Sequence, residues 1–189
     1  MVTKPNGTVK IHSDLIIKNT YVWWGWWHKS GEKVLFNVFS ELLQKIKTSK
    51  DLTIYLFDAG HSIIYKAKCI DIKYDNSGSA ISVPEADKAP DYYNQTDYLA
   101  WFKFSSIEKV DFEELKKNSY IEIEEFFTDK KYNFSLFNNK KIISTDELKL
   151  QERTIWFVRD ARDTELEPLT SALLVLRSTP DLSIMSAAL

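Results

Sequence analysis

The fold is decided by a central stretch that begins Leu52-Thr-Ile-Tyr-Leu-Phe-Asp58 and turns at Ala59-Gly60. The chain then runs back from His61 to Tyr74, with Ile, Tyr, Ala and Cys at alternate positions from Ile63 onward. Two runs of strand-forming residues on either side of a glycine-containing turn are the pattern of a β-hairpin. We therefore predict that these two runs form an antiparallel pair.

Further strands are predicted on both sides of this hairpin. Before it, Thr20–His28 has the pattern of an aromatic strand, and Thr8–Lys18 alternates in part, which predicts an early strand or two short ones. After it, residues 75–94 are polar and form a long loop, a kind of segment that is often functional. The remaining strand patterns are Tyr98–Ser106, Tyr120–Phe127 and Arg153–Arg159.

Helical patterns lie between the strands. Glu32–Lys47 places its apolar residues on one helical face, which are Leu35, Phe39, Leu42, Leu43 and Ile46. Shorter helical patterns are Asp111–Lys117, Thr145–Leu150 and Glu165–Arg177. These elements predict an α+β fold, in which a small, twisted, mostly antiparallel β-barrel is flanked by two or three helices.

The composition is that of an ordinary soluble domain. The chain has 189 residues, of which 44% are apolar and 28% charged, so one folded domain is expected and disorder is excluded. No apolar run approaches the roughly 20 residues of a membrane helix, and the polar N-terminus lacks a signal core. The lone Cys69 fits a reducing, cytoplasmic compartment. The three histidines and this cysteine show no ligand spacing, so we expect neither a metal site nor a cofactor.

Charge is distributed unevenly along the chain. The formal net charge is −2, but residues 1–50 carry eight Lys and three acidic residues, whereas residues 51–100 carry four Lys and eight acidic residues. A protein that coats duplex DNA without sequence preference is normally basic throughout. The sequence therefore permits a local basic surface for nucleic acid, but the net charge does not argue for one.

Tryptophan is concentrated in one place. Four of the six Trp lie within Trp23–Trp27, where only Gly25 interrupts them. Because side chains alternate along a strand, Trp24 and Trp26 share one face, and the two outer tryptophans share the other with Gly25. The commonest fate of any single tryptophan is burial in the core. For the whole set, we expect at least one ring to line a pocket.

Gly25 suggests which face is which. It interrupts the apolar surface of its own face, so we predict that the other face, with Trp24 and Trp26, lines the pocket. Trp101 and Tyr98, on a later strand, would supply the opposite wall. A bulge at Gly25 would exchange the two faces.

The order of these elements resembles the PUA-like superfamily, especially its EVE and YTH branches and the EVE-like specificity domains of modification-dependent restriction systems. The likeness rests on the opening Tyr21-Val-Trp-Trp24 strand and the helix after it, the central hairpin, Pro90-Asp91 before the aromatic strand, and the closing Ile155–Arg159. It covers residues 18–160. We expect residues 1–17 to be an N-terminal extension or edge strand, and residues 161–189 to be a C-terminal helix and linker leading to a further domain.

The resemblance implies a curved barrel that holds a modified or flipped base between aromatic side chains. Stacking contributes about 1–3 kcal/mol per base, which offsets the cost of extruding the base from a duplex. Trp24 or Trp26 would stack with Trp101 on the base, and Asp58 or Asn94 would hydrogen-bond its edge. The phosphates would be held by basic side chains, which are Lys18, Lys29, Lys33 and Arg159.

Two classes of function remain open. The first is a non-enzymatic recognition module, the sensor domain of a prokaryotic defence protein, which binds a modified or flipped base in DNA or RNA. The second is a domain that binds a small nucleotide or a partner protein and regulates an attached effector, and the near-neutral charge favours this class. An enzyme would have to use the neighbours Asp58 and His61, but a catalytic triad needs groups that converge from different elements. We therefore predict no catalytic residue.

Overall fold

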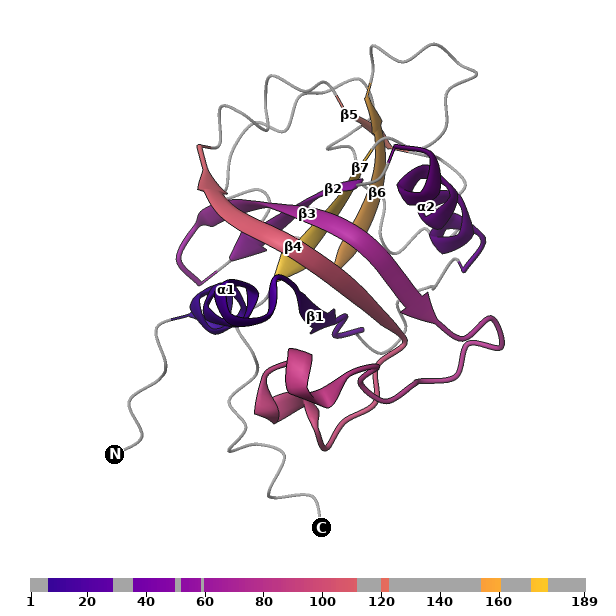
Figure 1. Ribbon diagram of the computed structural model, residues 1–189. Coiled ribbons are helices and arrows are strands. Elements are labelled where there is room, and N and C mark those ends of the chain that lie inside the picture. The colour runs from indigo at the N-terminus through magenta and orange to yellow at the C-terminus, as the bar shows by residue number, and fades with distance from the viewer. Residues whose placement is uncertain are drawn as a thin grey trace.

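The computed structural model describes residues 7–28, 36–49, 52–58, 60–111, 120–122, 154–160 and 171–176. Its centre is one twisted sheet with the strand order β1-β4-β3-β2-β7-β6-β5, shown in Figure 1. The strands are β1 (Val22–Gly25), β2 (Leu52–Asp58), β3 (Ile63–Tyr74), β4 (Ala100–Val110), β5 (Tyr120–Glu122), β6 (Ile155–Asp160) and β7 (Ser171–Leu176).

The predicted hairpin is confirmed as β2 and β3. Their antiparallel register runs from Leu52 opposite Cys69 to Asp58 opposite Ile63. The carboxylate of Asp58 accepts the backbone N–H groups of Gly60 and His61, at 3.0 and 3.2 Å, and so stabilises the turn. β3 continues the antiparallel pattern into β4, and β4 continues it into β1.

The sheet is not closed into the barrel that the sequence predicted. Its order runs from β1 at one edge to β5 at the other, and no ladder joins these edges in the part of the chain that the structure describes. β1 has four residues and β5 three, so each offers little backbone for a closing ladder. A side-chain bond bridges part of the gap, because Trp26 Nε1 donates to Thr154 Oγ1 at 2.9 Å, just before β6. The α+β class is confirmed.

Two helices pack on the sheet, α1 (Thr8–Asn19) on β1 and β4, and α2 (Phe36–Ser49) on β2 and β3. α2 agrees with the predicted helix and buries Phe39, Leu42 and Ile46, whereas the expected first turn, with Leu35, lies outside the described residues. Neither α1 nor α2 is long and apolar enough to cross a bilayer.

The early strand predicted over Thr8–Lys18 is wrong, because this segment is α1. Its inward side chains are Val9, His12 and Ile16, a spacing of three and four residues that marks one face of a helix. His12 is polar by type but fully buried, so a hydrophobicity pattern that treats histidine as polar misses this face.

The helix predicted over Glu165–Arg177 is also wrong where the structure describes it. Residues 171–176 form β7, which pairs in parallel with β2 and antiparallel with β6. The sequence there is Ser-Ala-Leu-Leu-Val-Leu, and a short continuous apolar run fits a central strand as well as a helix. The helices expected at Asp111–Lys117 and Thr145–Leu150 lie outside the described residues, except for Asp111 itself.

Residues 81–98, called the strap here, cover the face of β1 and β4 that α1 and α2 do not. The strap contains two short 3₁₀ helices, η1 (Ala86–Lys88) and η2 (Asp91–Tyr93). It begins and ends as a bridge in which Ile81 and Tyr98 exchange backbone hydrogen bonds of 2.8 and 3.0 Å. The long loop predicted before the aromatic strand is therefore an ordered cover.

Candidate functional site

The tryptophan cluster is divided between the two faces of the sheet. Trp24 and Trp26 lie in the core with α1 and α2, only 4% and 3% exposed. Trp101 lies on the opposite face with Trp23, under the strap. The register accounts for this, since Trp24 pairs with Phe102, one position away from Trp101. The structure does not bring Trp24 and Trp26 together with Trp101, and the predicted arrangement of these three side chains is wrong.

Gly25 does not leave its face open. A Cβ atom there would lie 2.9 Å from Cγ of Tyr98 and 3.1 Å from Cζ3 of Trp101, so these two rings already fill the space. The rings also pack edge to face, with centroids 5.1 Å apart. Gly25 is therefore the place where two aromatic rings approach the backbone of β1, and its face is a continuous apolar surface.

Glu85 links the strap to β1 and to the residue before it by hydrogen bonds. Its carboxylate accepts the Tyr21 hydroxyl at 2.8 Å and Nε1 of Trp23 at 2.6 Å. Both hydrogen bonds favour the charged form, and they lower the pKa of Glu85. The ammonium of Lys103 lies 3.8 Å from the same carboxylate and 3.6 Å from the centre of the Tyr21 ring, the geometry of a cation–π contact. Nε1 of Trp101 adds a 2.9 Å bond to the carbonyl of Ile81.

Replacing Glu85 by Gln is expected to lower the free energy of unfolding at pH 7 by about 1 kcal/mol, because a neutral amide has one acceptor oxygen for two donors. Asp87→Asn is the matched control, since Asp87 is an exposed neighbour whose carboxylate forms an ion pair with Lys88 at 2.9 Å. Urea unfolding followed by circular dichroism measures both variants. Equal stability of the two variants would contradict the role given to Glu85.

His12 lies where α1 and η2 meet at the free edge of β1. Its ring is stacked on Trp24, with centroids 3.9 Å apart and planes 26° apart, and the rings of Tyr92 and Tyr93 pack at steep angles to it. Nδ1 is 2.7 Å from the carbonyl of Thr8, so Nδ1 carries the proton and donates. Complete burial lowers the pKa of His12 to about 3, which leaves the ring neutral at pH 7.

The polar residues expected to hydrogen-bond the edge of a base lie on different elements of the fold. Asp58 is occupied by the β2–β3 turn, where it also lies 2.8 Å from Nδ1 of His61. Asn94 is exposed and ends η2 in the strap, and Tyr98 is half-buried against Trp101. Lys18 is exposed in the last turn of α1. Lys29, Lys33 and the side chain of Arg159 lie outside the described residues.

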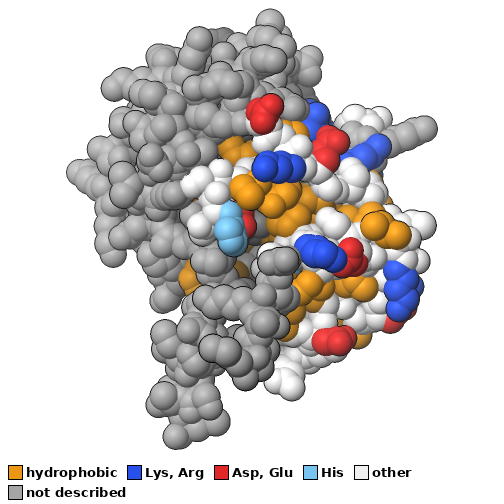
Figure 2. Space-filling view, turned by 90° about the vertical axis from the view of Figure 1, so that its left-hand side faces the viewer, with side chains coloured by type: hydrophobic (Ala, Val, Ile, Leu, Met, Phe, Trp, Pro, Cys, Tyr) orange, Lys and Arg blue, Asp and Glu red, His pale blue; other side chains and the backbone are white. Residues whose placement is uncertain are grey.

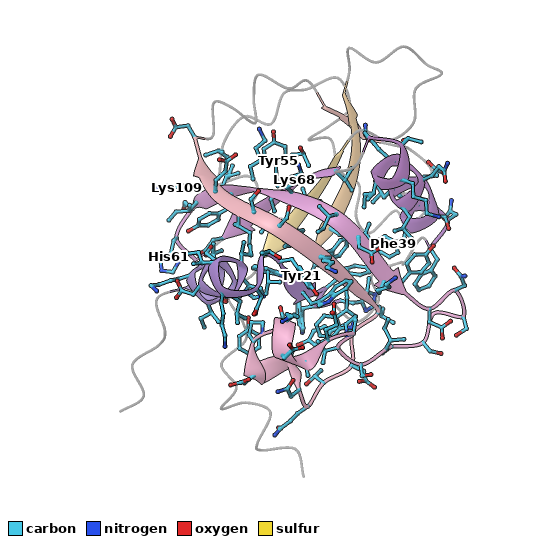
Figure 3. All side chains as sticks on the ribbon, in the orientation of Figure 1. Tyr21, Phe39, Tyr55, His61, Lys68 and Lys109 are labelled. Atoms are coloured by element: carbon cyan, nitrogen blue, oxygen red, sulfur yellow. The ribbon has the colours of Figure 1, made fainter. Side chains whose placement is uncertain are left out.

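The side of the molecule that carries α1 is not uniformly basic. Figure 2 shows the side of the molecule that carries α1 and the hairpin turn, where Lys or Arg and acidic side chains alternate around hydrophobic patches. A hollow of about 420 Å³ lies at the end of β4 near Lys109, which Figure 3 labels. It is lined by Lys66, Glu108, Lys109, Val110 and Asp111. Two basic and two acidic side chains leave this hollow without a net charge that would attract an anion.

Three large hydrophobic residues are exposed in the described part of the chain, which are Ile17, Trp27 and Tyr92. Trp27 is 44% exposed and lies two residues beyond the end of β1. The residue before it is firmly held, since the Trp26 ring packs edge-on against Phe39 of α2 and its backbone N–H donates to Ala100 at 2.9 Å. Trp27 therefore exposes its indole next to a residue whose backbone and side chain are both held by the fold.

Comparison with known protein families gives one match, because a family model described as Pua-like covers residues 1–168. The chain belongs to the Pua-like family. Neither curated proteins nor solved structures give a match. The predicted membership of the PUA-like superfamily is thereby confirmed, while its EVE and YTH branches remain a prediction. Pua-like domains are generally binding modules that take RNA or DNA.

In this Pua-like chain Trp27 is exposed, whereas the sequence predicted a pocket of Trp24, Trp26 and Trp101, which are all buried. Sequence reasoning placed Trp27 with Trp23, whereas β1 ends at Gly25 and Trp27 lies beyond the strand. His12 and Glu85 were not predicted, because the aromatic rings that pack on His12 and the two donors to Glu85 are distant from them in the sequence. The early end of the strand pattern at Gly25 is the one signal that could have separated Trp27 from the rest.

Proposed function

We propose that this Pua-like chain is a non-enzymatic recognition module that stacks an unpaired or flipped base of DNA or RNA on Trp27. The observation that carries the proposal is the contrast in exposure among the tryptophans. Of the five whose side chains are described, four are at most 4% exposed and Trp27 is 44% exposed. A base stacked on an aromatic side chain contributes about 1–3 kcal/mol, whatever its sequence.

The residue before Trp27 is held by hydrogen bonds, which suits Trp27 for stacking a base. Trp26, one residue earlier, is tied to β4 through its backbone and to Thr154 through its indole. The backbone next to Trp27 is therefore held before the ligand arrives, which reduces the conformational entropy that is lost when a base stacks on the ring.

The phosphate contacts are assigned to the lysines nearest to Trp27 in the sequence, which are Lys29 and Lys33, with Lys18 and Arg159 as further candidates. Because the net charge is only −2 and charges of both signs alternate on the described face, we assign few contacts. In its finer form the proposal is that the base is modified and that the module reports it to an effector in a prokaryotic defence protein. The resemblance to EVE-like specificity domains supports this form.

Replacing Trp27 by Ala is expected to weaken the binding of a fluorescently labelled single-stranded oligonucleotide by about 5- to 150-fold, the loss of one stacked base. Fluorescence anisotropy measures the affinity. Ile17→Ala is the matched control, because Ile17 is also a large exposed apolar side chain, at 83%, but lies on α1. Affinities that are equal for wild type and Trp27→Ala would overturn the proposal.

The alternative is a domain that captures a free small nucleotide, which the near-neutral charge favours. Salt separates the two functions. With two to four phosphate contacts, the logarithm of the oligonucleotide affinity should fall with the logarithm of salt concentration with a slope of about −1.5 to −3. Capture of one small ligand would give a much smaller slope, and a slope near zero would favour this alternative.

A further inference from the structure

The ammonium group of Lys103 lies in a small site that is lined by two aromatic rings and a carboxylate. We call this site the cation box, and its walls are Tyr21, Trp23 and Glu85. Nζ lies 3.6 Å from the centre of the Tyr21 ring, 5.3 Å from that of the Trp23 ring and 3.8 Å from Oε2 of Glu85. Lys103 reaches the box from β4, where it is opposite Trp23 in the register. The structure therefore already holds a cation between two rings and a negative charge.

The walls of the cation box are fixed by one another and not by the lysine. The carboxylate of Glu85 accepts hydrogen bonds from the hydroxyl of Tyr21 and from Nε1 of Trp23, so it sets the positions of both rings. These bonds also lower the pKa of Glu85, which keeps the carboxylate charged at pH 7. A site whose walls are in place before the ligand arrives loses little conformational entropy on binding.

Lys103 does not use the chemistry that distinguishes a primary ammonium. That group has three N–H donors and is strongly hydrated in water. The carboxylate oxygen is 3.8 Å from Nζ, which is too far for a hydrogen bond, and the two ring contacts depend on charge alone. A methylated ammonium keeps the charge and spreads it over methyl groups that need no hydrogen-bond acceptor. The cation box therefore suits a methylated ammonium better than it suits the lysine that occupies it.

We propose that the cation box binds the methylated ammonium group of an external ligand, which displaces the ammonium of Lys103. The ligand class is a trimethylammonium group on a short alkyl chain, as in choline or trimethylated lysine. The entrance is on the side of Glu85, whose side chain is 40% exposed, whereas that of Lys103 is 20% exposed. This site is distinct from Trp27 and goes beyond the function proposed above. In the absence of ligand, Lys103 fills the box and acts as an internal competitor.

The test is a titration of choline chloride with the full chain, followed by proton nuclear magnetic resonance of the ligand. It uses the Trp27→Ala background at constant ionic strength, because an exposed indole also attracts cations. Methyl protons that lie over ring faces shift upfield, so we expect a saturable upfield shift of the choline methyl signal. The comparison ligand is dimethylbutanol, in which an uncharged tert-butyl group replaces trimethylammonium. Choline should bind about tenfold more tightly than this alcohol.

Variants of the cation box identify the site. Lys103→Ala removes the internal competitor, so choline should bind several-fold more tightly, whereas Lys73→Ala removes the same charge from β3 and should have little effect. Glu85→Gln removes the negative charge and should weaken binding about tenfold, and Asp87→Asn is its control. Circular dichroism checks that each variant is folded. Lys103→Met, which keeps an unbranched apolar chain without the charge, replaces Lys103→Ala if that variant does not fold.

Trimethyllysine with blocked amino and carboxyl groups separates the two sources of the ligand. Tighter binding than choline indicates a methylated lysine of a polypeptide, and equal binding indicates a free small ion. The inference is overturned if choline and dimethylbutanol bind equally, if choline binds only after Lys103 is replaced, or if Glu85→Gln binds it as Asp87→Asn does. These outcomes leave the proposal for Trp27 standing, because that residue is absent from the test.

Discussion

Replacing Trp24 by Ala is expected to lower the free energy of unfolding by about 3–5 kcal/mol, whereas Trp27→Ala should change it by no more than about 0.5 kcal/mol. Trp24 is 4% exposed and packs against His12 and Phe104, so its removal leaves a cavity in the core. Trp27 is 44% exposed and leaves no such cavity.

The measurement for this pair is urea unfolding followed by far-ultraviolet circular dichroism, because fluorescence would change with the tryptophan itself. A loss of several kcal/mol can unfold a domain of ordinary stability, so Trp24→Phe is included as a milder change. A Trp24→Ala variant that melts like the wild type but no longer binds an oligonucleotide would contradict the structure. It would restore the pocket that the sequence predicted.

Acidification from pH 7 to pH 4.5 is expected to destabilise the fold by about 2–3 kcal/mol through His12 alone. The pKa of His12 is lowered from 6.5 to about 3 in the folded protein. Between pH 6.5 and about pH 3, His12 is therefore protonated in the unfolded chain but neutral in the folded chain. The free energy of unfolding falls as the pH falls through this range. Each pH unit within this window costs about 1.4 kcal/mol.

The control for this prediction is His12→Phe, which keeps an aromatic ring beside Trp24 but does not titrate. Urea unfolding at half-unit steps from pH 7 to pH 4.5 should show a steep loss for the wild type and a clearly shallower one for the variant. The carboxylates with a lowered pKa, such as Glu85, lose their contribution at more acidic pH and affect both proteins alike. Parallel curves for wild type and variant would contradict the buried, neutral state of His12.

The hairpin and α2 could be predicted because their patterns are local. β2 and β3 alternate around a glycine turn, and the apolar residues of α2 recur at helical spacing. α1 and β7 could not be predicted in the same way. The inward face of α1 includes a histidine, and the short apolar run of β7 suits either a helix or a strand.

The candidate site depended on contacts between distant residues, which no local pattern contains. The sequence showed that the tryptophans divide between two faces, and this division is confirmed for Trp24 and Trp23. It could not show that the strap, some 60 residues later, covers Trp23, or that Tyr98 of the strap and Trp101 of β4 fill the space at Gly25. The assignment of one face to a pocket rested on a gap that the rest of the chain fills.

Ultraviolet cross-linking of the chain to a single-stranded oligonucleotide, with the attached residue located by mass spectrometry, tests the central claim most directly. A stacked base lies in contact with the aromatic ring that holds it, so we predict that the major cross-link maps to Trp27 and disappears in Trp27→Ala, while Ile17→Ala keeps it. A major cross-link on Trp24, Trp26 or Trp101, or an unchanged yield in Trp27→Ala, would contradict the account.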